Sequence, residues 1–176
     1  IIGPSLGAEN VQRGLESIAA SFLLVLVFFV VYYRMFGLIT NIALLLNLLM
    51  LVAVMSVFGA TLSLPGLAGI ALTVGLSVDA NVLINERIRE ELRAGNTPLS
   101  SIATGYEKAA GTIADANVTA LLAGIALFVF GTGPVKGFAL SLIIGILTSM
   151  YTAVSVSKGV ATLIYGRRRK LAGLAI

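Results

Sequence analysis

Two short acidic motifs with nearly the same sequence contain the residues best suited to chemistry in this chain. Residues 78–82 read VDANV and residues 114–118 read ADANV, so Asp79 and Asp115 each precede an asparagine by two positions. An aspartate at the centre of a membrane-spanning helix costs on the order of 3 kcal/mol and usually faces a protein interior with a functional role. Asp79 lies inside a long apolar run, and we expect it to be a buried proton-binding group. The alternative is that its carboxyl only hydrogen-bonds a neighbouring helix.

Other polar residues accompany these aspartates. Asn81 and Asn85 are four positions apart and share one helix face, where they suit hydrogen bonds between helices. Asp115 and Asn117 come from the second motif, on a helix that we expect to run antiparallel to that of Asp79. The two carboxyl groups can then lie at similar depth, and if they approach closely they cannot both ionise easily. The alternative for Asp115 is that it hydrates or caps the start of its helix near the surface.

The residue types that the chain lacks limit the chemistry further. There is no His and no Cys, and the five apolar runs contain no Lys or Arg. The sequence therefore predicts no metal site, no cofactor other than protons, and no cationic partner for Asp79 within this chain. Either Asp79 is protonated much of the time, or another subunit supplies the cation. No glycine-rich phosphate loop is present, so we expect neither ATP hydrolysis nor any other enzymatic activity.

The composition indicates an all-α integral membrane protein. Of the 176 residues, 58% are hydrophobic and 11% are charged, and the mean hydropathy is +1.02. Soluble domains carry roughly 25% charged residues, so this chain is suited to lipid. Residues 17–165 are predicted to form a five-helix bundle after an interfacial or periplasmic lead-in over 1–16. The predicted spans are 15–34, 38–58, 65–86, 110–130 and 137–158. An amphipathic cytoplasmic loop over 87–109, with its own short helix at 99–108, and a basic tail over 166–176 complete the chain.

The basic residues predict the orientation in the membrane, because cytoplasmic loops carry an excess of Lys and Arg. Only Arg13 and Lys136 fall on one side. The other side carries Arg34, Arg87, Arg89, Arg93, Lys108, Lys158, Arg167, Arg168, Arg169 and Lys170. We therefore expect a periplasmic N-terminus and a cytoplasmic C-terminus. A basic tail beside anionic membrane lipid accounts for the net charge of +4 without a nucleic-acid partner.

Small residues predict which helices touch. Gly, Ala and Ser are frequent in the third, fourth and fifth spans and much rarer in the first two. Since small side chains let helix backbones approach closely, we expect spans three to five to form the inner bundle. The Leu-rich second span is expected to face lipid.

Three segments resemble the SecD subunit family of the bacterial SecDF protein-export accessory, which belongs to the resistance-nodulation-division superfamily. They are residues 62–70 (LSLPGLAGI), 78–87 (VDANVLINER) and 131–139 (GTGPVKGFA). The resemblance covers essentially the whole chain and corresponds to the C-terminal membrane part of SecD. That family also has an earlier transmembrane helix and large periplasmic domains. The resemblance implies a bundle equal to half of a superfamily transmembrane domain, in the bacterial cytoplasmic (inner) membrane.

The resemblance also implies a function. Members use the proton motive force to help the Sec translocon channel complete the export of unfolded polypeptides. The aspartate that matches Asp79 is the proton-coupling residue, and a SecF-like subunit is expected to supply its cationic partner. Two other interpretations stay open. One is a proton-driven transporter of a small lipophilic substrate or lipid in the same superfamily, and the other is a structural scaffold for the translocon.

Overall fold

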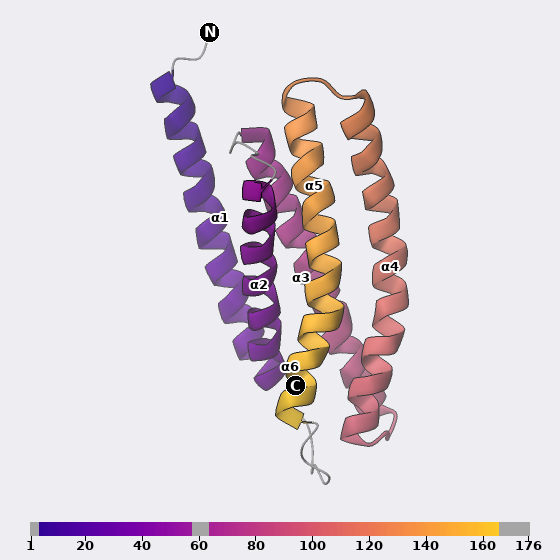
Figure 1. Cartoon of the computed structure of the whole chain (residues 1–176). Coiled ribbons are helices and arrows are strands. Elements are labelled where there is room, and N and C mark those ends of the chain that lie inside the picture. The colour runs from indigo at the N-terminus through magenta and orange to yellow at the C-terminus, as the bar shows by residue number, and fades with distance from the viewer. Residues whose placement is uncertain (1–3, 58–63, 166–176) are drawn as a thin grey trace.

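Five long helical segments run up and down side by side in the computed structural model, which describes residues 4–57 and 64–165 (Figure 1). The helices are α1 (Pro4–Tyr33), α2 (Met35–Val57), α3 (Leu64–Arg93), α4 (Pro98–Phe130) and α5 (Pro134–Met150). The π-helical segment η1 (Tyr151–Val156) and α6 (Ser157–Tyr165) continue α5 as one rod. Five helices in the described part of the chain are long and apolar enough to cross a membrane, which confirms the predicted all-α membrane fold.

Several helices extend beyond the spans predicted from the sequence. The expected lead-in joins the first span, because Gly7 and Gly14 do not interrupt α1. The third helix continues through its charged end to Arg93, as predicted. A separate short helix over 99–108 was wrong, since α4 runs unbroken from Pro98, where Thr97 caps it by accepting a hydrogen bond from Ser100 N. The predicted turn over 59–63 and the basic tail over 166–176 lie outside the described residues.

The packing centre lies between α3 and α5. These two helices pack most extensively, and α4 joins them on one side. Thr73 fits against Gly145, where an added Cβ would lie 2.3 Å from Thr73 Cγ2. The predicted inner role of spans three and five is thus observed, whereas α4 is mostly exposed. The Leu-rich α2 is more buried than expected, because its stripe of Thr40, Asn47 and Leu51 faces the other helices.

The connection between α1 and α2 is a single residue. Arg34 has a φ of 56°. This is the left-handed region, which is unusual for a residue with a side chain. Gly37 then packs directly on the α1 backbone, because a Cβ there would lie 1.9 Å from Phe29 O. The tight hairpin at this place therefore depends on a backbone contact that only glycine permits.

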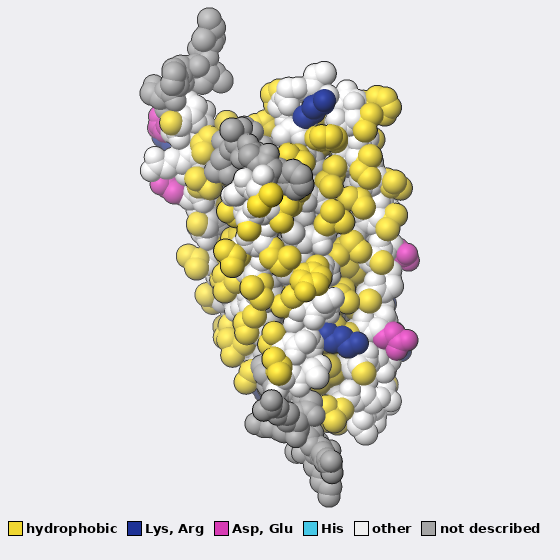
Figure 2. All heavy atoms as spheres, in the orientation of Figure 1, with side chains coloured by type: hydrophobic (Ala, Val, Ile, Leu, Met, Phe, Trp, Pro, Cys, Tyr) yellow, Lys and Arg dark blue, Asp and Glu magenta, His cyan; other side chains and the backbone are white. Residues whose placement is uncertain are grey.

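The outer surface is largely apolar. Figure 2 shows apolar side chains over most of the visible face, with Lys and Arg near its top and in its lower third. Large exposed hydrophobic residues occur on every long helix, including Leu24 on α1, Leu49 on α2 and Leu122 on α4. Such a surface suits lipid or other membrane helices rather than water.

Candidate functional site

Asp79 lies at the middle of α3 on an outward face. Counted from Leu64, where the helix begins, Asp79 is roughly 22 Å along the axis at about 1.5 Å per residue. The expected burial is not observed on the single chain, where its side chain is exposed because no described helix packs over this face of α3. Within residues 4–57 and 64–165 its carboxyl makes no hydrogen bond or ion pair, and the ion pairs of this part all involve other carboxylates. A cation supplied by another subunit stays a prediction.

A stripe of small residues leads along α3 to Asp79. Ala68, Ala71 and Gly75 are exposed and recur every three or four positions on the side of the helix that carries Asp79, and the larger exposed Leu72 lies among them. A Cβ added at Gly75 would meet nothing within 4 Å. This face therefore has the close-approach surface that membrane helices use to pack, but the described chain supplies no helix against it.

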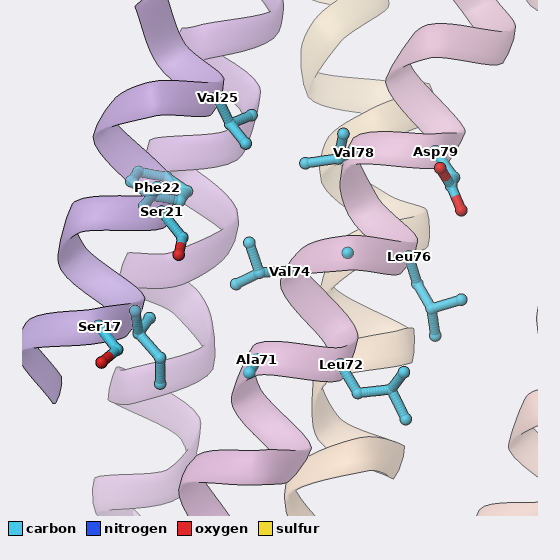
Figure 3. Close-up of a pocket in the computed structure, with 12 residues that line it drawn as sticks. Ser17, Ser21, Phe22, Val25, Ala71, Leu72, Val74, Leu76, Val78 and Asp79 are labelled. Atoms are coloured by element: carbon cyan, nitrogen blue, oxygen red, sulfur yellow. The ribbon is translucent and has the colours of Figure 1, made fainter. Parts of the chain in front are cut away.

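An apolar groove of about 660 Å³ lies between α1 and α3 and includes part of this stripe, since Ala71, Gly75 and Asp79 are among its lining residues. Its walls are the apolar side chains Ile18, Phe22 and Val25 of α1 and Val74 and Val78 of α3, with two α1 hydroxyls, Ser17 and Ser21. In Figure 3 Val74 and Val78 point toward α1, whereas Leu72, Leu76 and Asp79 point away from it. The carboxyl therefore lies at the edge of the groove rather than inside it.

The two asparagines after Asp79 lie on the buried side of α3. Asn81 Nδ2 donates to Ser77 O at 2.8 Å, and Asn85 Nδ2 donates to Thr40 Oγ1 of α2 at 2.9 Å. Asn85 therefore joins two helices, as the sequence suggested. The structure does not bring either asparagine to the carboxyl of Asp79, because positions two or six apart face different sides of a helix.

The second motif lies at the same depth as the first. Gly105 of α4 packs against Ile88 of α3, where an added Cβ would lie 2.5 Å from Ile88 Cγ1. The two helices are antiparallel, so continuing this pairing places Asp79 opposite Ala114, next to Asp115. Asp115 is exposed and Asn117 is buried. No hydrogen bond in the described residues joins the carboxyl groups of the two motifs, so a shared proton stays a prediction.

A cluster around Arg89, which we call the clamp, joins α1 to α3 at the end with the C-terminus. The sequence did not predict it. Arg89 lies over the rings of Tyr32 and Tyr33, at 4.6 and 4.7 Å, and donates to Tyr32 O at 3.0 Å. Glu86 accepts from Tyr33 Oη at 2.8 Å and from Arg89 at 3.3 Å. Glu86 and Arg89 are neighbours on one face of α3, whereas both tyrosines belong to α1. Their association required the turn at Arg34, which no local pattern shows.

The hairpin between α3 and α4 is fixed by a buried carboxylate, Glu91. Glu91 is only 7% exposed and accepts hydrogen bonds from Asn96 and from Lys108, with which it also forms an ion pair. Glu91 belongs to the segment 87–109 that was predicted to be an amphipathic cytoplasmic loop, so its burial is a correction. The reason is that α4 continues past Lys108 and packs on α3. No group of three or more metal-ligating side chains occurs in the described residues.

The comparison with known proteins decides the family. Residues 1–167 match the family described as protein export membrane protein SecD/SecF, C-terminal. The chain belongs to this family. Protein translocase subunit SecD of Acetobacter pasteurianus is 54% identical over 168 residues, covering 96% of this chain and 32% of that protein. For SecD of Escherichia coli the identity is 48%, over 96% of this chain and 28% of that protein. The predicted family resemblance is confirmed.

Solved structures agree with the SecD assignment. SecDF of Thermus thermophilus, described as a translocon-associated membrane protein, has a TM-score of 0.89 and 40% identity over 94% of this chain and 23% of that chain. SecDF in a super-membrane-facing form has a TM-score of 0.87 and 38% identity over 96% of this chain and 23% of that chain. The chain spans about a third of the length of its curated SecD relatives. The fold match confirms a bundle of the SecDF membrane type.

Proposed function

We propose that this chain is a membrane part of the Sec protein-export machinery that uses the proton motive force to assist late-stage translocation of unfolded polypeptides. Its coupling group is the Asp79 carboxyl. The observation that supports this most is the position of Asp79 at mid-helix, exposed on the single chain and without an ionic partner in its described part. In apolar surroundings the protonated form of a carboxyl is favoured, whereas a nearby cation favours the ionised form. Alternation between the two environments binds and releases one proton.

The cation is expected from a SecF-like subunit that packs on the small-residue stripe of α3. Ala68, Ala71 and Gly75 leave room for another helix backbone beside Asp79. A partner helix in this place would also remove the carboxyl from lipid. The Sec translocon channel and the polypeptide substrate belong to the same proposal, since the relatives named above are translocase subunits.

The charge distribution supports a periplasmic N-terminus and a cytoplasmic C-terminus in the inner membrane. Among the described residues only Arg13 and Lys136 lie toward the end with the N-terminus. Toward the other end lie Arg34, Arg87, Arg89, Arg93, Lys108 and Lys158. Since the basic side of a membrane protein is cytoplasmic, protons driven inward would pass Asp79 from the end with the N-terminus.

Asp79→Asn tests the proposal, because the amide keeps the shape of the side chain but cannot bind a proton. We expect proton-driven export in vesicles to be lost while co-purification with the SecF-like subunit and the channel persists. Glu90→Gln is the matched control, since Glu90 is an exposed carboxylate on the same helix that pairs with Arg87. Normal export by Asp79→Asn would overturn the proposal. Normal export combined with unchanged co-purification would instead favour a scaffold.

The groove beside α3 supports a second candidate function, the proton-driven transport of a lipid or small lipophilic molecule. Its volume is about 660 Å³ and its walls are apolar. Such dimensions fall in the range of small-molecule sites. The substitution Phe22→Ala enlarges this groove at its α1 wall, away from Asp79. Uptake of a fluorescent lipid that follows the proton gradient, needs no Sec channel and changes with Phe22→Ala would favour this candidate over export.

A further inference from the structure

Some side chains carry buried polar atoms without a hydrogen-bond partner in the described part of the chain, and four of them belong to fully buried residues of α2, α3 and α5. They are Oδ1 of Asn47, Oγ of Ser77, Oδ1 of Asn81 and Oγ of Ser149. Each of these residues is at most 1% exposed. Buried polar groups in native proteins nearly always have a partner, either in the protein or in ordered water. Four such atoms therefore call for a common explanation if they lie together.

The packing of α3 on α5 places two of them face to face. Gly69 packs against Ser141, and Thr73 packs against Gly145, four residues further along each helix. The helices run in the same direction, so the next step of this register places Ser77 opposite Ser149. One further step brings Asn81 to the level of Ala153, in the π-helical segment η1.

The fourth atom comes to the same level from α2. This helix runs antiparallel to α3, and Thr40 is joined to Asn85. Asn47 lies about two turns from Thr40 on α2, and Val78 lies about two turns from Asn85 on α3. Asn47 is therefore level with Val78, the neighbour of Ser77. Asn47 lies on the same buried stripe of α2 as Thr40 and Leu51. Side chains from three helices thus converge within about one turn of α3.

Nearby backbone groups do not satisfy these atoms. The carbonyl one turn before Ser149 is Gly145 O, which already accepts the hydroxyl of Thr148 at 3.1 Å. Asn81 uses its Nδ2 on Ser77 O, which leaves its oxygen as an acceptor that needs a donor. The two amide oxygens can only accept, whereas a hydroxyl can donate or accept. A water molecule, with two donors and two acceptors, matches this set.

We propose that Asn47, Ser77, Asn81 and Ser149 form a water-binding site between α2, α3 and α5. The water donates to the amide oxygens and exchanges hydrogen bonds with the two serine hydroxyls. Two to four polar partners are what a buried water requires. The site lies on the face of α3 opposite Asp79, so it is independent of the proposed proton-binding role. It adds polar links between these three helices to the Asn85–Thr40 hydrogen bond between α3 and α2.

The test is a double-mutant cycle on Ser77→Ala and Ser149→Ala, measured by thermal unfolding of the full-length protein in lipid nanodiscs. If both hydroxyls hold the same water, each substitution lowers the midpoint by about 2–4 °C, and the double variant loses less than the sum because the water is lost once. Ser141→Ala is the matched control, because the Ser141 hydroxyl donates to Gly137 O of its own helix at 2.8 Å. We expect it to change the midpoint little and to be additive with Ser77→Ala.

A high-resolution structure of the same protein provides a second measurement that does not depend on stability. A solvent peak within hydrogen-bond distance of Ser77 Oγ and Ser149 Oγ supports the site. Serine hydroxyls turned onto their own helices, with no such peak, overturn it. Midpoints of Ser77→Ala and Ser149→Ala that equal or exceed the parent value also overturn it, because removing a dry, unsatisfied hydroxyl costs nothing.

Discussion

Gly145→Ala tests the close contact at the packing centre. The new Cβ would lie 2.3 Å from Thr73 Cγ2 and 2.5 Å from Thr73 Cβ, where ordinary contacts are at least 3.4 Å. Thr73 cannot easily turn away, because it is β-branched and its hydroxyl bonds Gly69 O at 3.0 Å and Ile70 O at 2.9 Å. Since a close-packed interior has no void to take up the difference, one helix must move by roughly 1 Å relative to the other.

Overpacking of this kind costs about 2–3 kcal/mol, the upper part of the usual range. Alanine regains roughly 1 kcal/mol through its higher helix propensity. The net loss of about 1–2 kcal/mol corresponds to a fall of about 2–8 °C in the unfolding midpoint. Circular dichroism of the purified protein during heating measures this change, and Thr73→Ala in the Gly145→Ala background restores part of it.

Gly75→Ala is the control, since Gly75 is also a helical glycine but has nothing within 4 Å of an added Cβ. We expect its midpoint to stay the same or rise by about 2–4 °C, through helix propensity alone. If Gly145→Ala were as stable as Gly75→Ala, the close contact between α3 and α5 would be refuted.

Three further changes probe other contacts. Gly75→Leu adds bulk to the small-residue stripe, so we expect co-purification of a SecF-like subunit to fall at least about tenfold, or about 1.4 kcal/mol, with the chain's own midpoint unchanged. Arg89→Ala removes the clamp on Tyr32 and Tyr33, and the loss of about 1–3 kcal/mol should appear as faster amide exchange in the last turn of α1. Gly37→Ala, whose Cβ would lie 1.9 Å from Phe29 O, should prevent the α1–α2 hairpin and give no folded protein on size-exclusion chromatography.

The membrane fold could be predicted from the sequence because its causes are local. Long apolar runs require helices in lipid, since every backbone polar group must be satisfied within the segment. The predicted start of the third span at 65 lies one residue from the observed start of α3 at Leu64. The boundary at 110 was wrong because a charged, amphipathic segment and an apolar span can share one helix when nothing breaks it.

The place of Asp79 along its helix could be predicted from the sequence, but the direction in which its side chain points could not. Helical rise gives distance along the axis, whereas the facing of a side chain depends on which neighbours pack against its helix. The exposed side of Asp79 and the buried side of Asn85 became known only from the contacts of α3 with α2 and α5. The clamp around Arg89 and the burial of Glu91 were missed for the same reason, since both depend on contacts between residues of different helices.

Infrared difference spectroscopy of the full-length protein in membranes measures the central claim most directly, because it detects the protonated carboxyl itself. On titration with acid, we expect a carboxylic-acid carbonyl band that is absent in Asp79→Asn and retained in Glu90→Gln. In proteoliposomes the same band should change when a proton gradient is applied across the membrane. A spectrum of Asp79→Asn that matches the parent protein under both conditions would contradict the assignment of Asp79 as the proton-binding group.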